Sequence, residues 1–399
     1  MKKRKIVVLV GDGMGDYPVE ELGGRTPLQA ARIPHIRRLA AAGDLRMVQT
    51  VPVSGLAPGS DVANLSLLGY RPEDHYTGRA PIEAAGANLP LGADDVAFRC
   101  NLVTVADGRM DDYSAGHITT EEGRALIAAL EKDQGRDGLH FHGGVSYRHL
   151  LIWKNGPADI RTEPPHEISG KGVADYLPAG DGQDEVRALM ARSAELFRDH
   201  PVNKARIAAG KKPATQIWLW GQGRALKLPG YRELYGLTGG VITAVDLIRG
   251  LGRLIGLDVI HVPGATGFLD TNYAGKVQAA LDVIGKHPFV FVHIEAPDEC
   301  GHMGKAALKV EAIEAFETKV VAPVWKALEE KGEPYRLIVC MDHRTPVSVR
   351  GHTREPVPMI SVDGPVGAVS READFDEFVN GGVAAGSVVE RMRELLRTA

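Results

Sequence analysis

Three short apolar segments of the sequence, at 6–10, 289–294 and 337–341, are each followed by acidic or imidazole side chains. Open α/β sheets bind ligands at the carboxyl ends of their strands, so side chains that follow such strands meet at one edge. Several carboxylates gathered there would be costly to bury without a cation. Carboxylate oxygens together with imidazole nitrogens suit Mn²⁺ or Zn²⁺, and suit Mg²⁺ less well. The candidate ligands are Asp12, Asp298, His302, Asp342, His343 and His352.

Each of these residues, taken singly, has an ordinary structural explanation. An Asp that follows a strand, such as Asp12, commonly caps a turn or a helix. Asp298 and His302 have the spacing of a neighbouring pair on a helix surface. Their joint occurrence after three buried-type strands nevertheless favours a metal site over separate structural roles.

Ser60 stands at a predicted helix start, directly after a Pro-Gly turn in the segment 57–64. A hydroxyl there faces the positive end of the helix dipole, which favours a phosphorylated side chain. The structural alternative is that Ser60 only caps the helix. Because a serine hydroxyl is a weak nucleophile until a base or a metal activates it, Ser60 beside metal ions is a candidate phosphoryl acceptor.

The elements that would position these residues belong to an α/β protein with a largely parallel sheet, because β-branched segments alternate with helix-like segments such as 27–43 and 306–331. Near-continuous apolar strands predict that helices cover both sheet faces. The middle of the chain is richer in Gly, Pro and His, which predicts an inserted second α/β domain. We expect a discontinuous core domain of residues 1–90 plus 235–399 and an inserted domain of residues 91–234.

The composition excludes several classes of protein. The 399 residues include 47 Lys and Arg against 51 Asp and Glu, a formal charge of −4 that argues against a nucleic-acid partner. Three cysteines without a C-x-x-C pair fit a reducing cytoplasm. The apolar segment 6–10 is too short for a secretion signal, and no stretch approaches the roughly twenty residues of a membrane span. We therefore expect a cytoplasmic protein without nucleic-acid or membrane partners, and leave its oligomeric state open.

A series of longer motifs occurs in order over nearly the whole chain: G-D-G-M at 11–14, P-G-S-D-V-A-N at 58–64, D-Y-S-A-G-H at 112–117, G-V-S-Y-R-H at 144–149, 218–223, 264–267, 270–273, 295–299 and 342–343. In this order the motifs resemble those of the archaeal-type, cofactor-independent phosphoglycerate mutases of the alkaline phosphatase superfamily. The resemblance implies an alkaline-phosphatase-like core, with the inserted domain binding the glycerate.

The same resemblance implies roles for the matching residues. Ser60 would accept the phosphoryl group beside two divalent metal ions, Mn²⁺ first and Mg²⁺, Zn²⁺ or Co²⁺ as alternatives, without 2,3-bisphosphoglycerate. One ion would be held by Asp298, His302 and His352, and the other by Asp12, Asp342 and His343, with Ser60 between them. The contacts to the small phosphorylated substrate would be His117, Arg148, Arg224 and Lys276.

The implied reaction interconverts 3-phosphoglycerate and 2-phosphoglycerate through a phosphoserine. The chain departs from the archaeal pattern at Thr318, at 344–346 after His343 and at Gly351, and H-P-V-N at 200–203 resembles a bacterial branch proposed to contain homoserine kinases. The alternative is therefore an ATP-dependent homoserine kinase on the same scaffold, in which metal ions instead of a P-loop would hold the transferable phosphate. A phosphate-ester hydrolase and a non-catalytic metal-binding protein are further alternatives.

Overall fold

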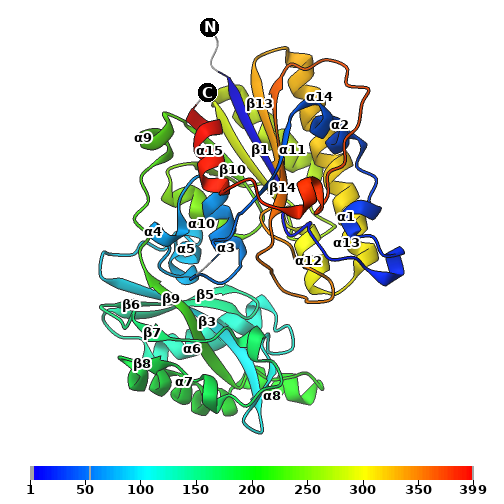
Figure 1. The fold of residues 1–399 in the computed structure, drawn as a ribbon. Coiled ribbons are helices and arrows are strands. Elements are labelled where there is room, and N and C mark those ends of the chain that lie inside the picture. The colour runs from blue at the N-terminus through cyan, green and yellow to red at the C-terminus, as the bar shows by residue number, and fades with distance from the viewer. Residues whose placement is uncertain (1–3, 54, 398–399) are drawn as a thin grey trace. The chain divides into compact units, whose positions relative to one another are not determined.

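Two compact units make up the computed structural model, which describes residues 4–53 and 55–397 (Figure 1). Unit 1 comprises Met1–Tyr76 and Leu228–Ala399, and unit 2 comprises Thr77–Lys227. These divisions fall earlier in the chain than the predicted boundaries near 90 and 235. The helix α5 (Arg79–Gly86) accounts for the first difference, because it packs on strands β3 (Asp95–Ala106) and β9 (Gln216–Arg224) of unit 2. That unit 2 binds the substrate stays a prediction.

A seven-stranded sheet forms the centre of unit 1, in the order β11–β10–β12–β1–β13–β14–β2. Strands β11 to β13 of this order run parallel, β14 is antiparallel to β13, and β2 is antiparallel to β14. The sheet is therefore mostly parallel, as predicted. Its strands are β1 (Lys5–Gly11), β2 (Asp44–Val48), β10 (Gly239–Ile242), β11 (Asp258–Ile260), β12 (Phe289–Ile294), β13 (Tyr335–Cys340) and β14 (Val357–Gly364).

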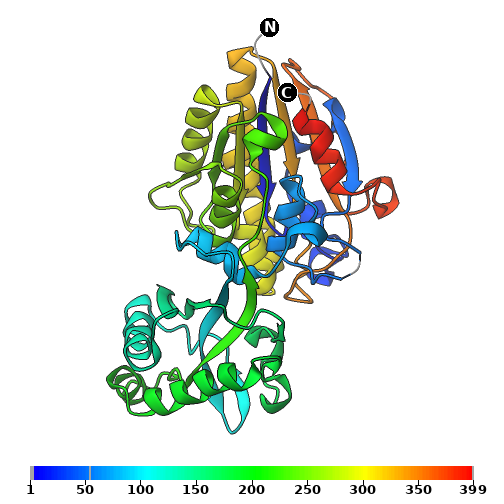
Figure 2. The same ribbon diagram turned by 90° about the vertical axis from the view of Figure 1, so that its left-hand side faces the viewer.

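The three central strands are buried along almost their whole length. Every residue of β12 and β13 is buried, as is every residue of β1 after Lys5. Because successive side chains of a strand point to opposite faces, this pattern requires cover on both faces. Helices lie on both sides of the sheet (Figure 2), and the prediction of an α/β core flanked by helices is confirmed.

Helices and short helical turns connect the strands of unit 1. They are η1 (Glu20–Leu22), α1 (Pro27–Ala30), α2 (Pro34–Ala42), α3 (Ser60–Leu67), α4 (Pro72–His75), α9 (Tyr231–Tyr235), α10 (Asp246–Leu254), α11 (Tyr273–Lys286), α12 (Ala296–His302), α13 (Ala306–Phe316), η4 (Glu317–Val321), α14 (Ala322–Lys331), η5 (Val379–Gly382) and α15 (Val388–Arg397). Among the described residues, no helix has the length and apolar character that would let it span a membrane.

Proline explains two differences from the predicted helices. The segment 27–43 forms α1 and α2 instead of one helix, because the residues before Pro34 are disfavoured in helical conformation and Pro34 begins the second helix. The segment 306–331 is helical throughout but contains the π-helical turn η4 directly before Pro323. Pro323 has no N–H to donate to the preceding turn, which suits this change of hydrogen-bond pattern.

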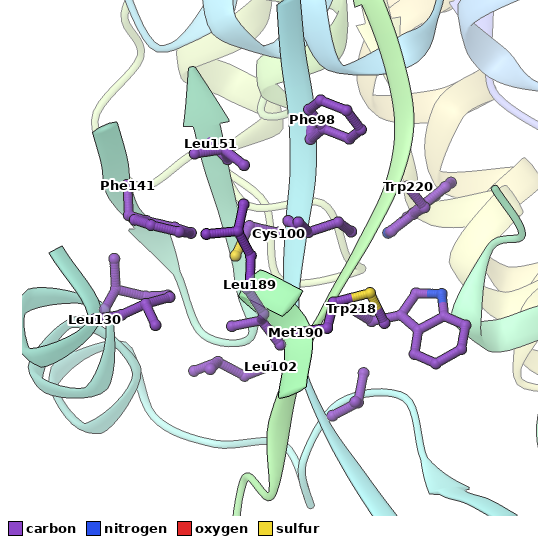
Figure 3. Packing of buried hydrophobic residues seen from close by; sticks show 14 of the residues in the cluster. Phe98, Cys100, Leu102, Leu130, Phe141, Leu151, Leu189, Met190, Trp218 and Trp220 are labelled. Carbon is purple, nitrogen blue, oxygen red and sulfur yellow. The ribbon is translucent and has the colours of Figure 1, made fainter. Parts of the chain in front are cut away.

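Unit 2 is built on an antiparallel sheet in which β3 pairs with β4, β6 and β9, and β5 pairs with β6. Phe98, Leu130, Phe141 and Trp218 belong to a single buried cluster between this sheet and its helices (Figure 3). The other elements are β4 (Arg109–Asp112), α6 (Thr120–Gln134), β5 (Leu139–Val145), β6 (Arg148–Lys154), β7 (Ile160–Arg161), η2 (Pro165–Ile168), η3 (Ala174–Tyr176), β8 (Ala179–Gly180), α7 (Gln183–Arg198) and α8 (Pro201–Ala208).

Candidate metal and phosphoryl-transfer site

The ends of three adjacent strands bring the predicted acidic residues of unit 1 together. Asp12 directly follows β1, which lies between β12 and β13 in the sheet. Asp298 lies in the first turn of α12, which begins two residues after β12 ends, and Asp342 lies two residues after β13. Because the three strands are parallel, these carboxylates converge at one edge of the sheet, as their positions in the sequence predict.

Ser60 is the first residue of α3, and all eight residues of this helix are buried. The N-cap is Gly59, whose extended backbone makes no side-chain capping bond. The Ser60 hydroxyl therefore does not cap the helix. Its Oγ lies 3.0 Å from Nε2 of His343 instead. Because the Ser60 hydroxyl is not needed to cap the helix, it is free to take part in a reaction.

Asp12, Asp342 and His343 form the first ligand group, in which one donor atom from each residue lies within 4.8 Å of the others. Nε2 of His343 is 3.5 Å from Asp12 Oδ1 and 3.5 Å from Asp342 Oδ2. Asp342 Oδ1 accepts hydrogen bonds from the backbone N–H groups of Gly13 and His343, and Asn64 Nδ2 donates to Oδ2. These bonds hold the Asp342 carboxylate in one orientation.

Asp298, His302 and His352, the predicted second ligand group, also come together, although the donor atoms that lie within 4.8 Å of one another are those of Asp298, His352 and His343. His302 Nε2 lies 3.2 Å from Asp298 Oδ2, His352 Nε2 lies 3.5 Å from Asp298 Oδ1, and the two Nε2 atoms are 3.1 Å apart. Arg350 O accepts from His302 Nδ1 at 2.9 Å, which leaves Nε2 of that ring to face Asp298. His343 also lies within reach of Asp298 and His352, so it connects the two groups. We call all six residues, with Ser60, the ligand cluster.

The carboxylates of the ligand cluster lie in different electrostatic surroundings. Burial and repulsion from Asp342 and Asp298 raise the pKa of Asp12 well above its usual range. Burial also opposes ionisation of Asp298, but hydrogen bonds to His302 and His352 hold its pKa well below its usual range. Burial lowers the pKa of His343 to about 4 despite the charge of Asp342, so its imidazole is neutral at pH 7.

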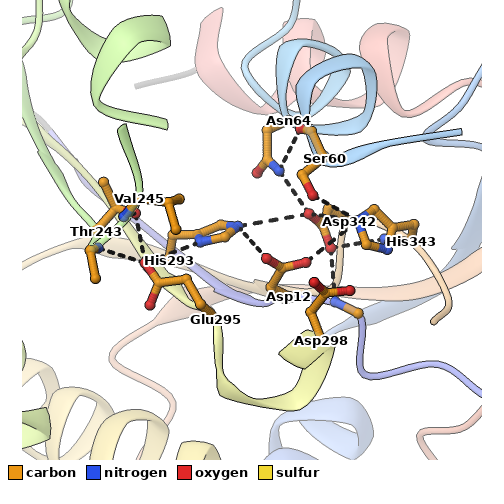
Figure 4. A network of polar contacts seen from close by, with 12 residues as sticks. Asp12, Ser60, Asn64, Thr243, Val245, His293, Glu295, Asp298, Asp342 and His343 are labelled. Atoms are coloured by element: carbon orange, nitrogen blue, oxygen red, sulfur yellow. Dashed lines mark hydrogen bonds and ion pairs between the residues drawn. The ribbon is translucent and has the colours of Figure 1, made fainter. Parts of the chain in front are cut away.

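A second buried layer lies behind Asp12 and Asp342, and it includes His293, which the sequence interpretation missed. His293 Nε2 lies 3.5 Å from Asp12 Oδ2 and 3.7 Å from Asp342 Oδ2, on the side of these carboxylates away from His343 (Figure 4). Glu295, next in this layer, accepts hydrogen bonds from Thr243 Oγ1, Ala244 N–H and Lys276 Nζ. Burial would raise the pKa of Glu295, but the Lys276 charge and His293 hold it well below its usual range.

The donor set fits divalent metal ions. Among the residues that the structure describes, Asp12 Oδ1 and both ring nitrogens of His293 are buried without a hydrogen-bond partner, although unpaired buried polar atoms are costly. Three carboxylates and three imidazoles supply the mixed oxygen and nitrogen ligands that Mn²⁺ or Zn²⁺ takes. Neutral His343 and ionised Asp298 are already in the protonation states that metal binding requires, whereas Asp12 and His302, whose pKa values are raised, would release protons when an ion binds.

Unit 2 contains a cluster of opposite charge. Glu83 accepts from Arg79 Nε at 2.9 Å and from Arg99 Nε at 2.8 Å, and Arg148 lies near enough to lower its pKa, against the effect of burial. The Arg99 guanidinium also stacks over Trp220, 4.3 Å from the ring centroid. We call Arg79, Arg99 and Arg148 the arginine cluster. It places three cations around one carboxylate, which makes it suited to an anionic ligand.

Comparisons with known proteins identify the family. A family model described as 2,3-bisphosphoglycerate-independent phosphoglycerate mutase matches residues 40–203. A probable 2,3-bisphosphoglycerate-independent phosphoglycerate mutase of Geobacter sulfurreducens is 48% identical, over 98% of this chain and 99% of that protein. A 2,3-bisphosphoglycerate-independent phosphoglycerate mutase of Methanosarcina barkeri is 52% identical over 89% of each. This chain belongs to the 2,3-bisphosphoglycerate-independent phosphoglycerate mutase family.

Solved structures agree with this family assignment. A protein from Pyrococcus horikoshii superposes with a TM-score of 0.81 at 28% identity, covering 100% of this chain and 99% of that one. The cofactor-independent phosphoglycerate mutase of Thermoplasma acidophilum superposes with a TM-score of 0.63 at 27% identity, covering 100% of both chains. The predicted resemblance to archaeal-type mutases is therefore confirmed.

The predicted substrate contacts of this mutase-family chain lie in different surroundings. His117, Arg148 and Arg224 are exposed on unit 2, where Arg148 adjoins the arginine cluster and Arg224 Nη1 donates to Asp94 O. Lys276, predicted to contact substrate, is fully buried in unit 1 and bonded to His293 O and Glu295. Its position supports a structural role, because the buried ammonium neutralises a buried carboxylate.

Proposed function

We propose that this chain interconverts 3-phosphoglycerate and 2-phosphoglycerate through a phosphoserine at Ser60. The observation that carries this proposal is the 3.0 Å contact between Ser60 Oγ and Nε2 of His343, the imidazole that connects both ligand groups. A buried serine hydroxyl with no capping role, aimed at metal-ligand side chains, is the arrangement that a phosphoryl acceptor needs.

Two divalent ions, Mn²⁺ first among the candidates, would be held by the ligand cluster. Asp298, His302 and His352 would hold one ion, and Asp12, Asp342 and His343 would hold the other beside Ser60. When bound, these ions supply positive charge that stabilises the transferring phosphoryl group and lowers the pKa of the serine hydroxyl. No 2,3-bisphosphoglycerate is required, because Ser60 itself carries the phosphoryl group between the two half-reactions.

The chain's own residues position the nucleophile and keep the exchange balanced. Asn64 Nδ2 donates to Ser60 O and to Asp342, which fixes the first turn of α3 against the ligand cluster. Ser60 Oγ forms a bond to the phosphorus of the 3-phosphate while the bond to the substrate's 3-oxygen breaks. The 2-hydroxyl then takes the phosphoryl group from Ser60. The proton gained at the 3-oxygen balances the proton lost from the 2-hydroxyl. Because the phosphoryl group comes from the substrate itself, no nucleotide is consumed.

The arginine cluster of unit 2 is suited to the negative charges of the substrate. Its planar guanidinium groups can donate paired hydrogen bonds to a carboxylate or a phosphate. Glu83 and Trp220 hold Arg99 by a hydrogen bond and by ring stacking, so little side-chain freedom is lost when an anion binds. We assign the small phosphorylated substrate to this cluster, with Arg148 as its exposed member.

The features that raised the homoserine kinase alternative have structural explanations. In the segment 200–203, His200 caps α8, while Asn203 Nδ2 donates to Phe197 O and Ala214 O inside unit 2. Arg344 is buried and donates to Pro356 O. Because these side chains bond within the fold, their departure from the archaeal pattern gives no support to a different phosphoryl acceptor.

A serine-to-alanine pair tests the proposal. We expect Ser60→Ala to lower turnover by several orders of magnitude while the Mn²⁺ content is retained, because the acceptor oxygen is lost and the ligands remain. The control is Ser66→Ala, on the same buried helix, whose hydroxyl bonds Val62 O within α3. Acid-quenched protein incubated with 3-phosphoglycerate should yield a phosphopeptide containing Ser60 in the wild type and Ser66→Ala only. Full turnover by Ser60→Ala would contradict the mechanism.

A further inference from the structure

Thr345 lies between the two ligand groups, although it follows His343 by two residues and belongs to neither group. Its side chain is fully buried. Thr345 Oγ1 is 2.5 Å from Asp298 Oδ1 and 3.1 Å from His343 Nδ1. A single hydroxyl therefore contacts one carboxylate of the second group and the imidazole that connects both groups.

The direction of these two hydrogen bonds follows from their chemistry. An ionised carboxylate can only accept, so Thr345 Oγ1–H donates to Asp298 Oδ1. The remaining lone pairs of Oγ1 accept from His343 Nδ1–H. With its proton on Nδ1, the neutral His343 ring presents the lone pair of Nε2 toward Ser60 Oγ and Asp12. The hydroxyl thus selects the tautomer in which His343 can act as a ligand.

The backbone around Thr345 is held by a buried ion pair. Thr345 N–H donates to Gly15 O at 3.0 Å, and Lys309 Nζ donates at 2.8 Å to Thr345 O. Lys309 is fully buried and also donates to Asp16 Oδ2 at 2.8 Å. These contacts join the loops that follow β1 and β13, so the hydroxyl is fixed before any ligand binds.

Close packing fixes the Thr345 side chain as well. A Cβ atom added at Gly301 would lie 2.9 Å from the Thr345 methyl carbon, and one added at Gly13 would lie 2.5 Å from its hydroxyl oxygen. The absence of a side chain at the two glycines therefore leaves the space that the Thr345 side chain occupies.

We propose that Thr345 is a positioning residue that orients ligands of both metal ions through one hydroxyl group. This inference rests on the proposed two-metal function. Without the hydroxyl, Asp298 Oδ1 loses its donor and His343 Nδ1–H is left buried without an acceptor. Because partners of metal ligands are worth about 10- to 100-fold in metal affinity, we expect one substitution to weaken both sites together.

Three variants separate the hydroxyl from the volume of the side chain. Thr345→Val places a methyl group where the hydroxyl stood and crowds Asp298, whereas Thr345→Ala removes the hydroxyl and leaves space. Thr345→Ser keeps the hydroxyl and removes only the methyl group. Metal-free full-length protein is titrated with Mn²⁺, and the electron paramagnetic resonance signal of unbound Mn²⁺ gives the number and affinity of the sites. Circular dichroism of the metal-free variants establishes that each is folded.

We expect two sites in the wild type, both weakened about 10- to 100-fold in Thr345→Val and Thr345→Ala, and both within about threefold of wild type in Thr345→Ser. Where Thr345→Val does not fold, Thr345→Ala decides the result alone. Loss of affinity at one site only, unchanged affinities, or a serine variant as weak as the alanine variant would each overturn the inference and leave the proposed function standing. A wild type that binds fewer than two Mn²⁺ would overturn both.

Discussion

The ligand cluster of unit 1 and the arginine cluster of unit 2 carry opposite charges and are stabilised to different degrees. In the arginine cluster, Glu83 bonds two guanidinium groups, and Trp220 stacks on one of them. In the ligand cluster, Asp12 Oδ1 has no hydrogen-bond partner among the described residues, and burial and repulsion from Asp342 raise the pKa of Asp12. Glu83 thus offsets part of the positive charge of the arginine cluster from within the protein, whereas Asp12 in the ligand cluster has no arginine or lysine partner among the described residues and is suited to an added cation.

Buried carboxylates elsewhere in unit 1 show what internal compensation looks like. Asp16 is paired with Lys309, and Glu295 is paired with Lys276, in both cases with full burial of the lysine. Asp12, a few residues before Asp16 in the sequence, contacts the imidazoles of His293 and His343, and no lysine pairs with it among the described residues. The presence or absence of a buried lysine partner therefore distinguishes carboxylates with a structural role from candidate metal ligands.

The largest expected effect comes from removing one charge of the ligand cluster. Asp342→Asn keeps the shape of the side chain, but we expect the protein to lose one tightly bound Mn²⁺ and turnover to fall on the order of 10³-fold, since the ion supplies several kcal/mol to the transition state. Inductively coupled plasma mass spectrometry and a mutase assay measure the two effects. Asp363→Asn, an exposed carboxylate paired with the buried Arg336, is the control. If Asp342→Asn still bound two Mn²⁺ ions, the claim that the charge of the ligand cluster holds added cations would be contradicted.

Removing a lysine tests the carboxylates that have a buried lysine partner. We expect Lys276→Met to lower the free energy of unfolding of the metal-free protein by about 3–5 kcal/mol, because the buried Glu295 loses its ammonium partner. The double variant Lys276→Met/Glu295→Gln should recover most of this loss. Urea unfolding measures both, with exposed Lys326→Met expected within about 0.5 kcal/mol of wild type. If Lys276→Met were instead as stable as wild type but raised KM, Lys276 would be a substrate contact.

A substitution in the arginine cluster should change substrate affinity without changing metal binding. We expect Arg148→Gln to raise KM for phosphoglycerate about 10- to 100-fold, since a hydrogen bond to a charged group contributes about 1.5–3 kcal/mol, while two Mn²⁺ remain bound. Arg192→Gln, an exposed arginine of unit 2 paired with Asp133, is the matched control. Equal KM values for the two variants would remove the arginine cluster from the substrate site.

The smallest effect concerns a buried imidazole of unit 2. Burial lowers the pKa of His149 to about 3, so the folded state holds this ring neutral. Because the folded pKa lies below the unfolded value of about 6.5, the stability from this group is complete above pH 6.5 and is lost as the pH falls toward 3. In urea unfolding series, His149→Asn should remove up to about 1.4 kcal/mol per pH unit from the wild-type slope. Identical slopes would contradict this account.

The sequence predicted those parts of the site that depend on local order along the chain. Apolar segments identified β1, β12 and β13, and the acidic residues after them were expected at one sheet edge, where the structure brings them together. His293 was missed because a single polar residue inside an apolar strand carries no periodic signal. Thr345 was missed because its proposed role depends on a hydrogen bond to Asp298, which is 47 residues away in sequence.

Two other features depend on tertiary packing that local pattern does not reveal. The arginine cluster was missed in part because Arg99 meets Glu83 only when β3 packs against α5. Trp218 and Trp220 both belong to the buried cluster of unit 2, and Trp220 also stacks on Arg99. Residues two apart in a strand share a face, so only the partners above that face distinguish their roles.

Phosphorus-31 NMR of the purified, Mn²⁺-loaded protein tests the central claim most directly. One sample contains 3-phosphoglycerate alone, and a second contains ATP with homoserine. The account predicts that the 2-phosphoglycerate signal grows in the first sample without nucleotide, and that the second sample does not change. Phosphohomoserine in the second sample with no conversion in the first would contradict the proposed reaction, although the fold and the ligand cluster would stand.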